Sequence, residues 1–159
     1  MRTALFPGSF DPFHNGHLEI VERAAALFDQ VVVVVISNPQ KADSFFDLDE
    51  RKAMVTESTS GLGNVRAMGG HGLVVDVAKE VGATAIVKGI RAWSDFESEM
   101  QQAQMNHSLS GIDTVFLPTG LKHSFVASRL LKEVAKLGGD VSPFVPESVA
   151  ARIDARLRR

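Results

Sequence analysis

The amino-acid sequence predicts an α/β protein whose five parallel strands form one doubly wound sheet. The first observation is that short apolar runs alternate along the chain with segments of helical periodicity. The second is the run Val31–Val35, in which β-branched residues follow one another without a polar residue. Such a strand is buried on both faces, as in a parallel sheet covered by helices. The third is the length of 159 residues, 45% of them apolar, which suffices for one hydrophobic core.

The first half of the chain predicts two strands, each followed by a helix. The apolar run Thr3–Phe6 is followed by Pro7-Gly8 and predicts a strand that ends in a turn. A helix is expected next, because apolar residues recur at helical spacing, at Leu18, Val21, Ala25 and Phe28. After the strand Val31–Val35, the segment Asp47–Glu50 has the spacing of a capping box and predicts a helix through about Ser58.

The second half continues this alternation. Three further strands are expected, at Asn64–Met68, Thr84–Val87 and Thr114–Leu117. Three helices accompany them, at Leu73–Val81, from a second capping-box pattern at Ser94–Glu97 toward His107, and at Val126–Leu137. Pro146 suits the first position of a last helix, over about 146–157. Because no linker or repeat interrupts the sequence, we expect residues 1–159 to form one domain, a Rossmann-like sheet with helices on both faces.

The composition excludes several classes of function. The 17 Lys and Arg residues against 19 Asp and Glu give a net charge of −2, which argues against a nucleic-acid-binding protein held by bulk positive charge. There is no cysteine, which excludes disulfides, thiolate metal sites and a cysteine nucleophile. The longest apolar run, Val31–Ile36, is far shorter than the roughly 20 residues that span a membrane. Since Pro7 also interrupts the N-terminus before a signal-peptide core forms, we expect a soluble, cytoplasmic protein.

Ligands of doubly wound sheets bind at the carboxyl ends of the strands, near the point where the strand order reverses. The candidate segments are those that follow the predicted strands: Pro7–His17, Ser37–Lys41, Gly69–Val74, Lys88–Arg91 and Pro118–Ser128. The pattern Gly-x-x-x-x-Gly-Lys-Ser/Thr does not occur in the sequence, which excludes nucleotide hydrolases and kinases of the P-loop type. Gly61-Leu-Gly63 is interpreted as a turn, because it follows a helix rather than a strand.

The densest candidate motif is Gly8–His17, which joins the first strand to the first helix. Gly16 and His17 would lie at the helix N-terminus, where free backbone N–H groups and the helix dipole favour an anionic phosphate. His17 can donate a hydrogen bond to a phosphoryl oxygen, and Ser9 offers a hydroxyl and a backbone N–H. The alternative is that the two histidines only cap the helix. Metal binding by His14 and His17 is disfavoured, since no third ligand occurs at a recognisable spacing.

Cations follow two of the predicted strands. Lys88 and Arg91 follow the fourth strand, and Lys41 follows the second. Each of them alone would be interpreted as a solvated surface residue. Three at the same edge of a sheet, in a protein of net negative charge, indicate a polyphosphate site. Glu99 is either an exposed acid or an acceptor for a hydroxyl or amino group of the ligand.

Two further segments remain open to two interpretations. The segment His123–Ser128 precedes a predicted helix and would suit phosphates, but Ser124 acting as an N-cap explains it equally well. The C-terminal segment carries four arginines around apolar positions: Arg152, Arg156, Arg158 and Arg159. For these, a solvated face with an intramolecular or subunit contact is favoured over an arm that binds nucleic acid.

The motifs resemble those of a known enzyme family. Gly8-Ser-Phe-Asp-Pro with His14-x-Gly-His17 resembles the Thr/His-x-Gly-His signature of the nucleotidyltransferase superfamily. Motifs further along the chain resemble those of bacterial phosphopantetheine adenylyltransferases: Asn38-Pro-x-Lys41, Phe46-x-Leu-x-Glu-Arg51, Lys88-Gly-x-Arg91, Asp95-Phe-Glu-x-Glu99-Met, Met105-Asn106, Ser124-Phe-Val, Lys132-Glu-Val-Ala and Gly139-Asp-Val. The similarity extends from Ala4 to about Pro146.

The resemblance implies transfer of the adenylyl group of ATP to 4′-phosphopantetheine, giving dephospho-coenzyme A and pyrophosphate in coenzyme A biosynthesis. It implies Mg²⁺ bound mainly by the phosphates, with few dedicated ligands from the protein and no residue named as one. It also implies a homohexamer and feedback inhibition by coenzyme A, with no nucleic-acid or membrane partner. The alternatives are nucleotidyl transfer to another phosphorylated acceptor, such as nicotinamide mononucleotide or glycerol 3-phosphate, and a catalytically inactive nucleotide sensor.

The resemblance also assigns roles to individual residues. His17 is implied as the catalytic residue that stabilises the transition state. The implied ATP-binding residues are Ser9, Phe10, His17, Gly89, Ile90, Arg91, Glu99, His123, Ser124, Phe125, Val126, Ala127, Ser128 and Arg129. Those implied for phosphopantetheine are Ser9, Lys41, Val74 and Lys88. The chain departs from the family pattern at four positions, His14, Lys88, Ala127 and Arg129, where threonine, arginine and two serines are usual.

Overall fold

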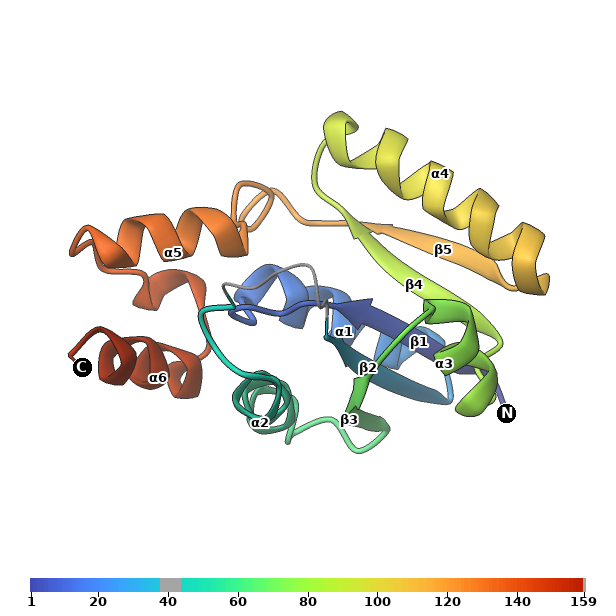
Figure 1. The fold of residues 1–159 in the computed structure, drawn as a ribbon, viewed down its shortest axis with the longest axis horizontal. Coiled ribbons are helices and arrows are strands. Elements are labelled where there is room, and N and C mark those ends of the chain that lie inside the picture. The colour runs from blue at the N-terminus through green and yellow to red at the C-terminus, as the bar shows by residue number, and fades with distance from the viewer. Residues whose placement is uncertain (38–43, 159) are drawn as a thin grey trace.

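A computed structural model describes residues 1–37 and 44–158 of the chain (Figure 1). Within these residues, five parallel strands form one sheet in the order β3-β2-β1-β4-β5. The strands are β1 (Thr3–Gly8), β2 (Gln30–Ile36), β3 (Val65–Gly70), β4 (Ala85–Ile90) and β5 (Asp113–Pro118). The predicted doubly wound parallel sheet is therefore confirmed.

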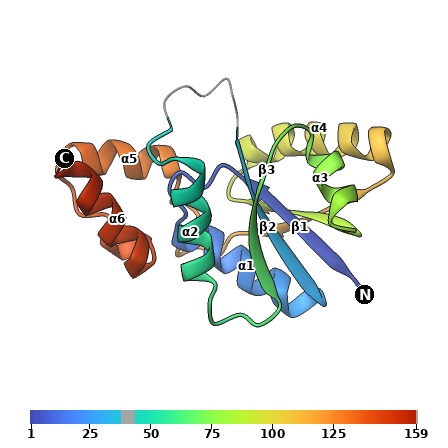
Figure 2. The same cartoon turned by 60° about the horizontal axis from the view of Figure 1, so that its bottom comes forward.

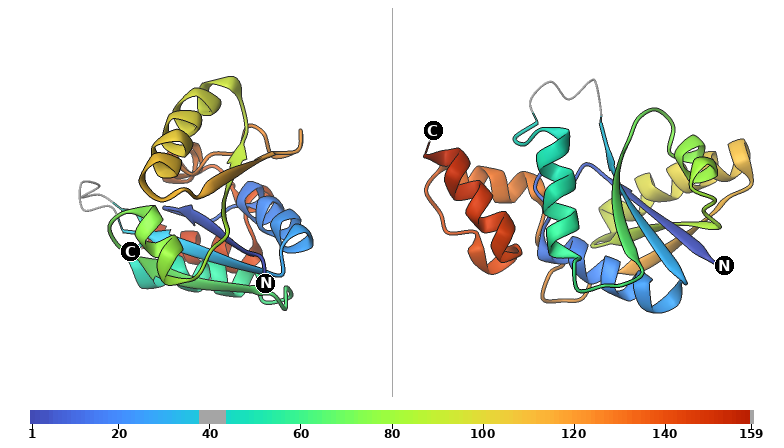
Figure 3. Two further views of the ribbon diagram at one scale, coloured as in Figure 1. Left: turned by 90° about the vertical axis from the view of Figure 1, so that its right-hand side faces the viewer. Right: turned by 90° about the horizontal axis from the view of Figure 1, so that it is seen from below.

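Of the α-helices in the described residues, four lie on the two faces of this sheet and two lie beyond it (Figure 2). They are α1 (Asn15–Leu27), α2 (Leu48–Ser58), α3 (Val74–Glu80), α4 (Trp93–Ser110), α5 (Ser128–Lys136) and α6 (Glu147–Leu157), with a short 3₁₀ helix at Ser142–Phe144. Helices α1 and α2 cover one face and α3 and α4 the other, as Figure 3 shows. Helices α5 and α6 lie side by side beyond the sheet, next to α2 (Figure 2). None of the described helices is long and apolar enough to cross a membrane.

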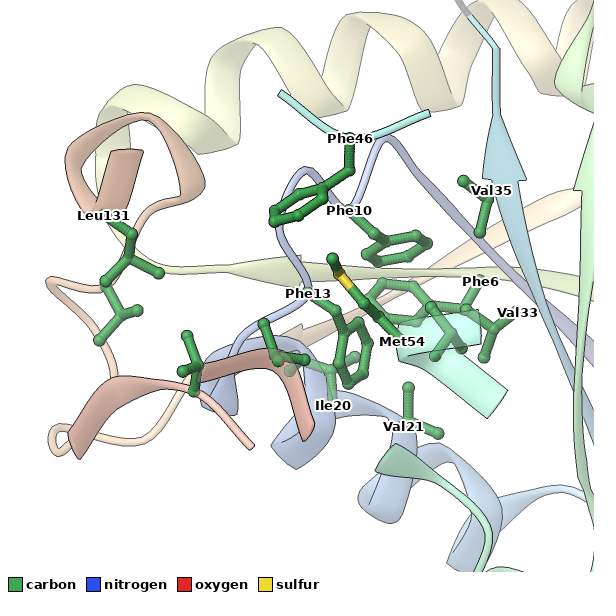
Figure 4. Packing of buried hydrophobic residues seen from close by; sticks show 14 of the residues in the cluster. Phe6, Phe10, Phe13, Ile20, Val21, Val33, Val35, Phe46, Met54 and Leu131 are labelled. Atoms are coloured by element: carbon green, nitrogen blue, oxygen red, sulfur yellow. The ribbon is translucent and has the colours of Figure 1, made fainter. Parts of the chain in front are cut away.

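The side chains of β2 explain why the sheet is covered on both faces. Successive side chains of a strand point to opposite faces. Accordingly, Val31, Val33 and Val35 pack with Phe6 and helix α1 (Figure 4), whereas Val32 and Val34 pack on the other face with α3. All five valines are fully buried. This confirms the prediction that an unbroken β-branched run is covered on both sides.

The carboxyl end of β1 differs from the sequence prediction. The predicted turn at Pro7-Gly8 is wrong, because β1 continues through both residues, which pair with Val34 and Val35 of β2. With β4, in contrast, β1 pairs only at Ala4 and Leu5. The two strands therefore separate toward their carboxyl ends. This is also the point at which the strand order reverses, where ligands of such sheets bind.

Three helix starts also differ from the predictions. Helix α4 begins at Trp93 after Ala92, without a side-chain cap in the described residues, so the predicted capping box at Ser94–Glu97 is wrong. The side chain of Asp95 instead accepts hydrogen bonds from Arg91. Helix α5 begins after its predicted start, at Ser128. Pro146 precedes α6 as its N-cap rather than occupying its first position. Such shifts arise because tertiary contacts select the exact end of a helix.

Candidate active site

Two adjoining clefts open at the carboxyl ends of β1 and β4. The larger has a volume of about 320 Å³ and the smaller about 130 Å³. Four residues line both clefts: Pro7, Gly8, Lys88 and Glu99. The larger is also lined by several predicted ATP-binding residues: Phe10, His17, Gly89, Arg91, Ala127, Ser128 and Arg129. The smaller is lined by three of the four residues predicted for phosphopantetheine, Ser9, Val74 and Lys88. The fourth, Lys41, lies outside the described residues.

The N-terminus of α1 brings two histidines into the larger cleft. His14 is the N-cap, and its Nδ1 accepts from the N–H groups of Gly16 (3.1 Å) and His17 (3.3 Å). In return, the backbone N–H of His14 donates to Nδ1 of His17 at 3.2 Å. The interpretation that both histidines cap the helix is therefore confirmed, since together they form a capping box. The expectation that the Gly16 and His17 amides are free for phosphate is wrong, because the imidazole of His14 already binds both.

These hydrogen bonds determine the tautomer of each histidine. Because Nδ1 is an acceptor in both rings, the proton of each neutral imidazole lies on Nε2. Burial, with smaller contributions from Arg91 and His123, lowers the pKa of His14 to about 3. Burial, followed by electrostatic interaction with His14, Arg91 and Lys88, lowers the pKa of His17 well below 6.5. Both rings are therefore neutral at pH 7 and present an Nε2–H donor.

The ring of His17 is also held by its neighbours. It stacks on His14, with ring centroids 3.5 Å apart, and on Phe13 at 5.5 Å. The edge of Phe10 closes a third side at 4.9 Å. Phe10 itself has a left-handed backbone (φ 49°) and packs over Gly8, where an added Cβ would lie 2.7 Å from the phenyl ring. Gly8 thus allows Phe10 to lie beneath the cleft and to position His17.

The loop between β1 and α1 is anchored by two buried charged residues for which the sequence reasoning assigned no role. The carboxylate of Asp11 accepts from the backbone N–H groups of Phe45 and Phe46, both at 2.9 Å, and pairs with Lys132 at 3.2 Å. The guanidinium of Arg51 donates to the carbonyl of Ser9 at 2.8 Å. The motifs Ser-Phe-Asp-Pro and Glu-Arg contain these residues, but no local pattern indicates that either is buried.

Lys88 in β4 and Arg91 just after it both line the larger cleft, and each is paired with a carboxylate. Lys88 Nζ lies 3.3 Å from Glu99 Oε2, at the boundary between the clefts. Arg91 donates to Asp95 at 3.1 and 3.3 Å and to the carbonyl of Val126 at 3.1 Å. The sequence reasoning missed Asp95, although its spacing of four residues from Arg91 is typical of a helical ion pair.

The segment between β5 and α5 contributes fewer side chains to the clefts than the sequence predicts. The hydroxyl of Ser128 donates to the carbonyl of Pro12 at 2.8 Å and faces the larger cleft. Ser124 donates to the carbonyl of Leu121 and does not cap α5, whose N-cap is Ala127. Five predicted ATP-binding residues are not among the residues found to line the described clefts: Ile90, His123, Ser124, Phe125 and Val126. Thr119, which lies in the candidate segment Pro118–Ser128 but was assigned no role, does line the larger cleft.

The two clefts combine positive charge with neutral donors. Lys88 and Arg91 supply the charge, and the Nε2–H groups of His14 and His17 supply donors that do not titrate near pH 7. Such a surface suits phosphate groups and can stabilise negative charge that develops on them. In the described part of the chain, no group of three or more His, Cys, Asp or Glu residues is arranged to hold a metal ion.

Comparisons with known proteins show a family and a similar solved structure. Residues 5–134 match the family model described as cytidylyltransferase-like. Among solved structures, the chain is similar to the lipopolysaccharide core biosynthesis protein from Thermoplasma volcanium GSS1. The sequence identity is 27%, the TM-score is 0.56, and the alignment covers 76% of this chain and 97% of that one. The matched segment 5–134 contains all the residues found to line the two clefts.

Proposed function

Since the chain belongs to the cytidylyltransferase-like family of nucleotidyltransferases, we propose that it transfers the adenylyl group of ATP to 4′-phosphopantetheine. The products are dephospho-coenzyme A and pyrophosphate. The choice of acceptor rests on the motif resemblance that extends from Ala4 to about Pro146. A place in coenzyme A biosynthesis, a homohexamer, inhibition by coenzyme A and a cytoplasmic location belong to the same proposal.

The observation that carries this proposal is that the two clefts share the ion pair between Lys88 and Glu99 as a common wall. Lys88 and Glu99 line both clefts. The larger cleft, with the donor of His17, suits the phosphates of ATP. The smaller cleft, with Ser9 and Val74, suits an acceptor whose phosphate lies at Lys88. Two substrates bound in this way would bring the acceptor phosphate to the α-phosphorus of ATP, which is the arrangement that transfer requires.

The reaction needs neither a base nor a covalent nucleophile from the protein. The acceptor phosphate is largely ionised at pH 7, because the second pKa of such a group is about 6. One of its oxygens forms a bond to the α-phosphorus of ATP. The bond from that phosphorus to the oxygen bridging the β-phosphate breaks, and its electron pair leaves with pyrophosphate. The barrier comes from the approach of two anions, which hydrogen-bond donors and cations lower.

His17 is suited to stabilise the oxygens of the α-phosphoryl group. Its Nε2–H is oriented before the substrate binds, because His14 holds Nδ1 and the aromatic rings hold the plane. A preorganised donor favours the charge of the transition state. A neutral imidazole donor also remains a donor across the physiological pH range.

The cations of the clefts would bind the substrate phosphates. Lys88 and Arg91 are held by Glu99 and Asp95, so an arriving phosphate would replace or share a carboxylate partner. Mg²⁺ bound with ATP would neutralise part of the triphosphate charge. Since these two carboxylates of the described cleft are already paired, phosphate oxygens would be the main ligands of the ion.

The proposal is tested by measuring pyrophosphate release from Mg-ATP with 4′-phosphopantetheine, nicotinamide mononucleotide and glycerol 3-phosphate in parallel. We expect release with 4′-phosphopantetheine alone. His17→Ala is expected to lower kcat roughly 10²–10³-fold, the scale for one lost transition-state donor. His17→Asn retains an acceptor for the His14 N–H and controls for the loss of the cap. His107→Ala, at an exposed histidine that lines neither cleft, is expected to behave as the wild type.

The alternative outcomes separate the competing functions. Release with another acceptor only would retain nucleotidyl transfer and overturn the substrate. ATP binding without release on any acceptor would support the nucleotide sensor. Full activity of both His17 variants would overturn the role assigned to the imidazole.

A further inference from the structure

We propose that Glu19 is a positioning residue for the ATP side of the active site, because its carboxylate holds the loop between β5 and α5 against helix α1. This inference rests on the proposed function. It concerns a residue that does not line either cleft but is bonded to a loop that does.

The carboxylate of Glu19 binds two groups of that loop at once. Its Oε1 accepts from the backbone N–H of Gly120 at 2.8 Å, and its Oε2 accepts from Nδ1 of His123 at 2.8 Å. The Glu19 and His123 side chains are only 23% and 19% exposed. A carboxylate with two short hydrogen bonds in a partly buried site is a strong link between two segments. The hydrogen bond from His123 lowers the pKa of Glu19, and the bond from Gly120 and electrostatic interaction with His123 and Arg23 act in the same direction, against the opposing effect of burial.

The approach of Glu19 to the loop depends on a glycine. A Cβ added to Gly120 would lie 2.8 Å from Oε1 of Glu19, closer than carbon and oxygen normally approach. A side chain at position 120 would therefore require the Glu19 carboxylate to move.

The contact extends one turn further along α1. Arg23 donates from Nη1 to the carbonyl of Pro118, and its guanidinium lies 3.9 Å from Oε1 of Glu19. On the other side, the N–H of Thr119 donates to the carbonyl of Ile90 at 2.8 Å. The beginning of the loop is therefore held by α1 and β4 together.

Helix α1 therefore contacts two parts of the site, the His17 donor and the loop between β5 and α5. Its first turn carries His17, the donor to the α-phosphoryl group in the proposed reaction. Its second turn carries Glu19, which holds the loop that leads from Thr119 to Ala127, both in the larger cleft. Movement of the loop would displace these cleft residues relative to His17. His123, which the resemblance assigns to ATP binding, acts in this arrangement through Glu19, since its Nδ1 is bonded to the carboxylate.

The test compares steady-state kinetics of the full chain with those of Glu19→Ala, Glu19→Gln and Glu22→Ala. We expect Glu19→Ala to raise KM for ATP about tenfold, the effect of losing charge-assisted hydrogen bonds. The KM for 4′-phosphopantetheine is expected to stay the same, because the acceptor cleft lies on the other side of Lys88. Glu19→Gln retains an acceptor for the Gly120 N–H, so its KM for ATP is expected to lie between those of the wild type and Glu19→Ala. Glu22 is exposed on the same helix and provides the matched control.

Hydrogen exchange and a double variant make the test independent of overall stability. In Glu19→Ala, faster amide exchange is expected at Gly120, with unchanged exchange in β2. The variants His123→Ala and Glu19→Ala/His123→Ala are expected to raise KM for ATP by no more than Glu19→Ala alone, because both residues act through one contact. If Glu19→Ala does not fold, Glu19→Gln and His123→Ala supply the same comparison.

Three results would overturn the positioning role. The first is an unchanged KM for ATP in Glu19→Ala. The second is a lower kcat with both KM values unchanged. The third is independent, multiplicative effects of the two single substitutions, which would mean that His123 contacts ATP directly. Each requires a wild-type protein that releases pyrophosphate, whereas a wild-type protein that releases none would overturn the proposed function itself.

Discussion

The buried His14 makes the stability of the protein depend on pH in a calculable way. Its pKa is lowered from 6.5 to about 3 in the folded protein, first by burial and then by Arg91 and His123. At pH 7 the imidazole is neutral in both the folded and the unfolded chain. Below pH 6.5 the unfolded chain binds a proton there and the folded protein does not. Unfolding is therefore increasingly favoured as the pH falls from 6.5 toward 3.

The magnitude follows from the width of this interval. One unit between pH and pKa corresponds to about 1.4 kcal/mol. At pH 5, His14 therefore lowers the free energy of unfolding by about 2 kcal/mol relative to pH 7. His17, whose pKa is lowered in the same direction, adds to this loss. The lowered pKa of Glu19 contributes stability that begins to be lost only below its ordinary value of 4.5, outside the interval from pH 7 to pH 5.

The assay is urea unfolding followed by circular dichroism at pH 7 and pH 5. His14→Asn is the informative variant, because asparagine also caps helices and does not titrate. We expect the free energy of unfolding to fall about 2 kcal/mol less between the two pH values in this variant than in the wild type. His71→Asn, at an exposed histidine, is expected to follow the wild type. Equal pH dependence of His14→Asn and the wild type would refute the argument that His14 stays neutral when folded.

Two further substitutions test the clefts and their support. Lys88→Ala is expected to raise KM for 4′-phosphopantetheine more than KM for ATP, because the ammonium lies where the two clefts meet. A rise in KM for ATP alone would mean that the two subsites are reversed. Arg51→Met removes the donor to the carbonyls of Ser9 and Ile36, both of which would lose a partner inside the protein. It is expected to lower the free energy of unfolding by about 3 kcal/mol, measured by urea titration at pH 7. Unchanged stability would mean that water replaces the guanidinium there.

Local sequence patterns predicted most of the architecture correctly. The valines of β2 indicated a strand covered on both faces, and both faces are covered. The Asp47–Glu50 spacing predicted a capping box, which forms with hydrogen bonds of 2.8 and 2.9 Å. The buried strand and the capping box each depend on residues that are close together in the chain, so a local sequence pattern is enough to predict them. The same reasoning failed at Ser94, where an ion pair between Arg91 and Asp95 accompanies the start of the helix instead.

The sequence by itself determined the succession of strands and helices along the chain and the loops that form the site. Only the tertiary structure decided which atoms meet there. Asp11 reaches Phe45 across 34 residues, and Glu19 reaches His123 across 104. The neutrality of His17 likewise depends on burial among remote groups. The physical reason is that hydrogen bonding, burial and pKa depend on three-dimensional distance, which is set here by the strand order β3-β2-β1-β4-β5 and by no local pattern.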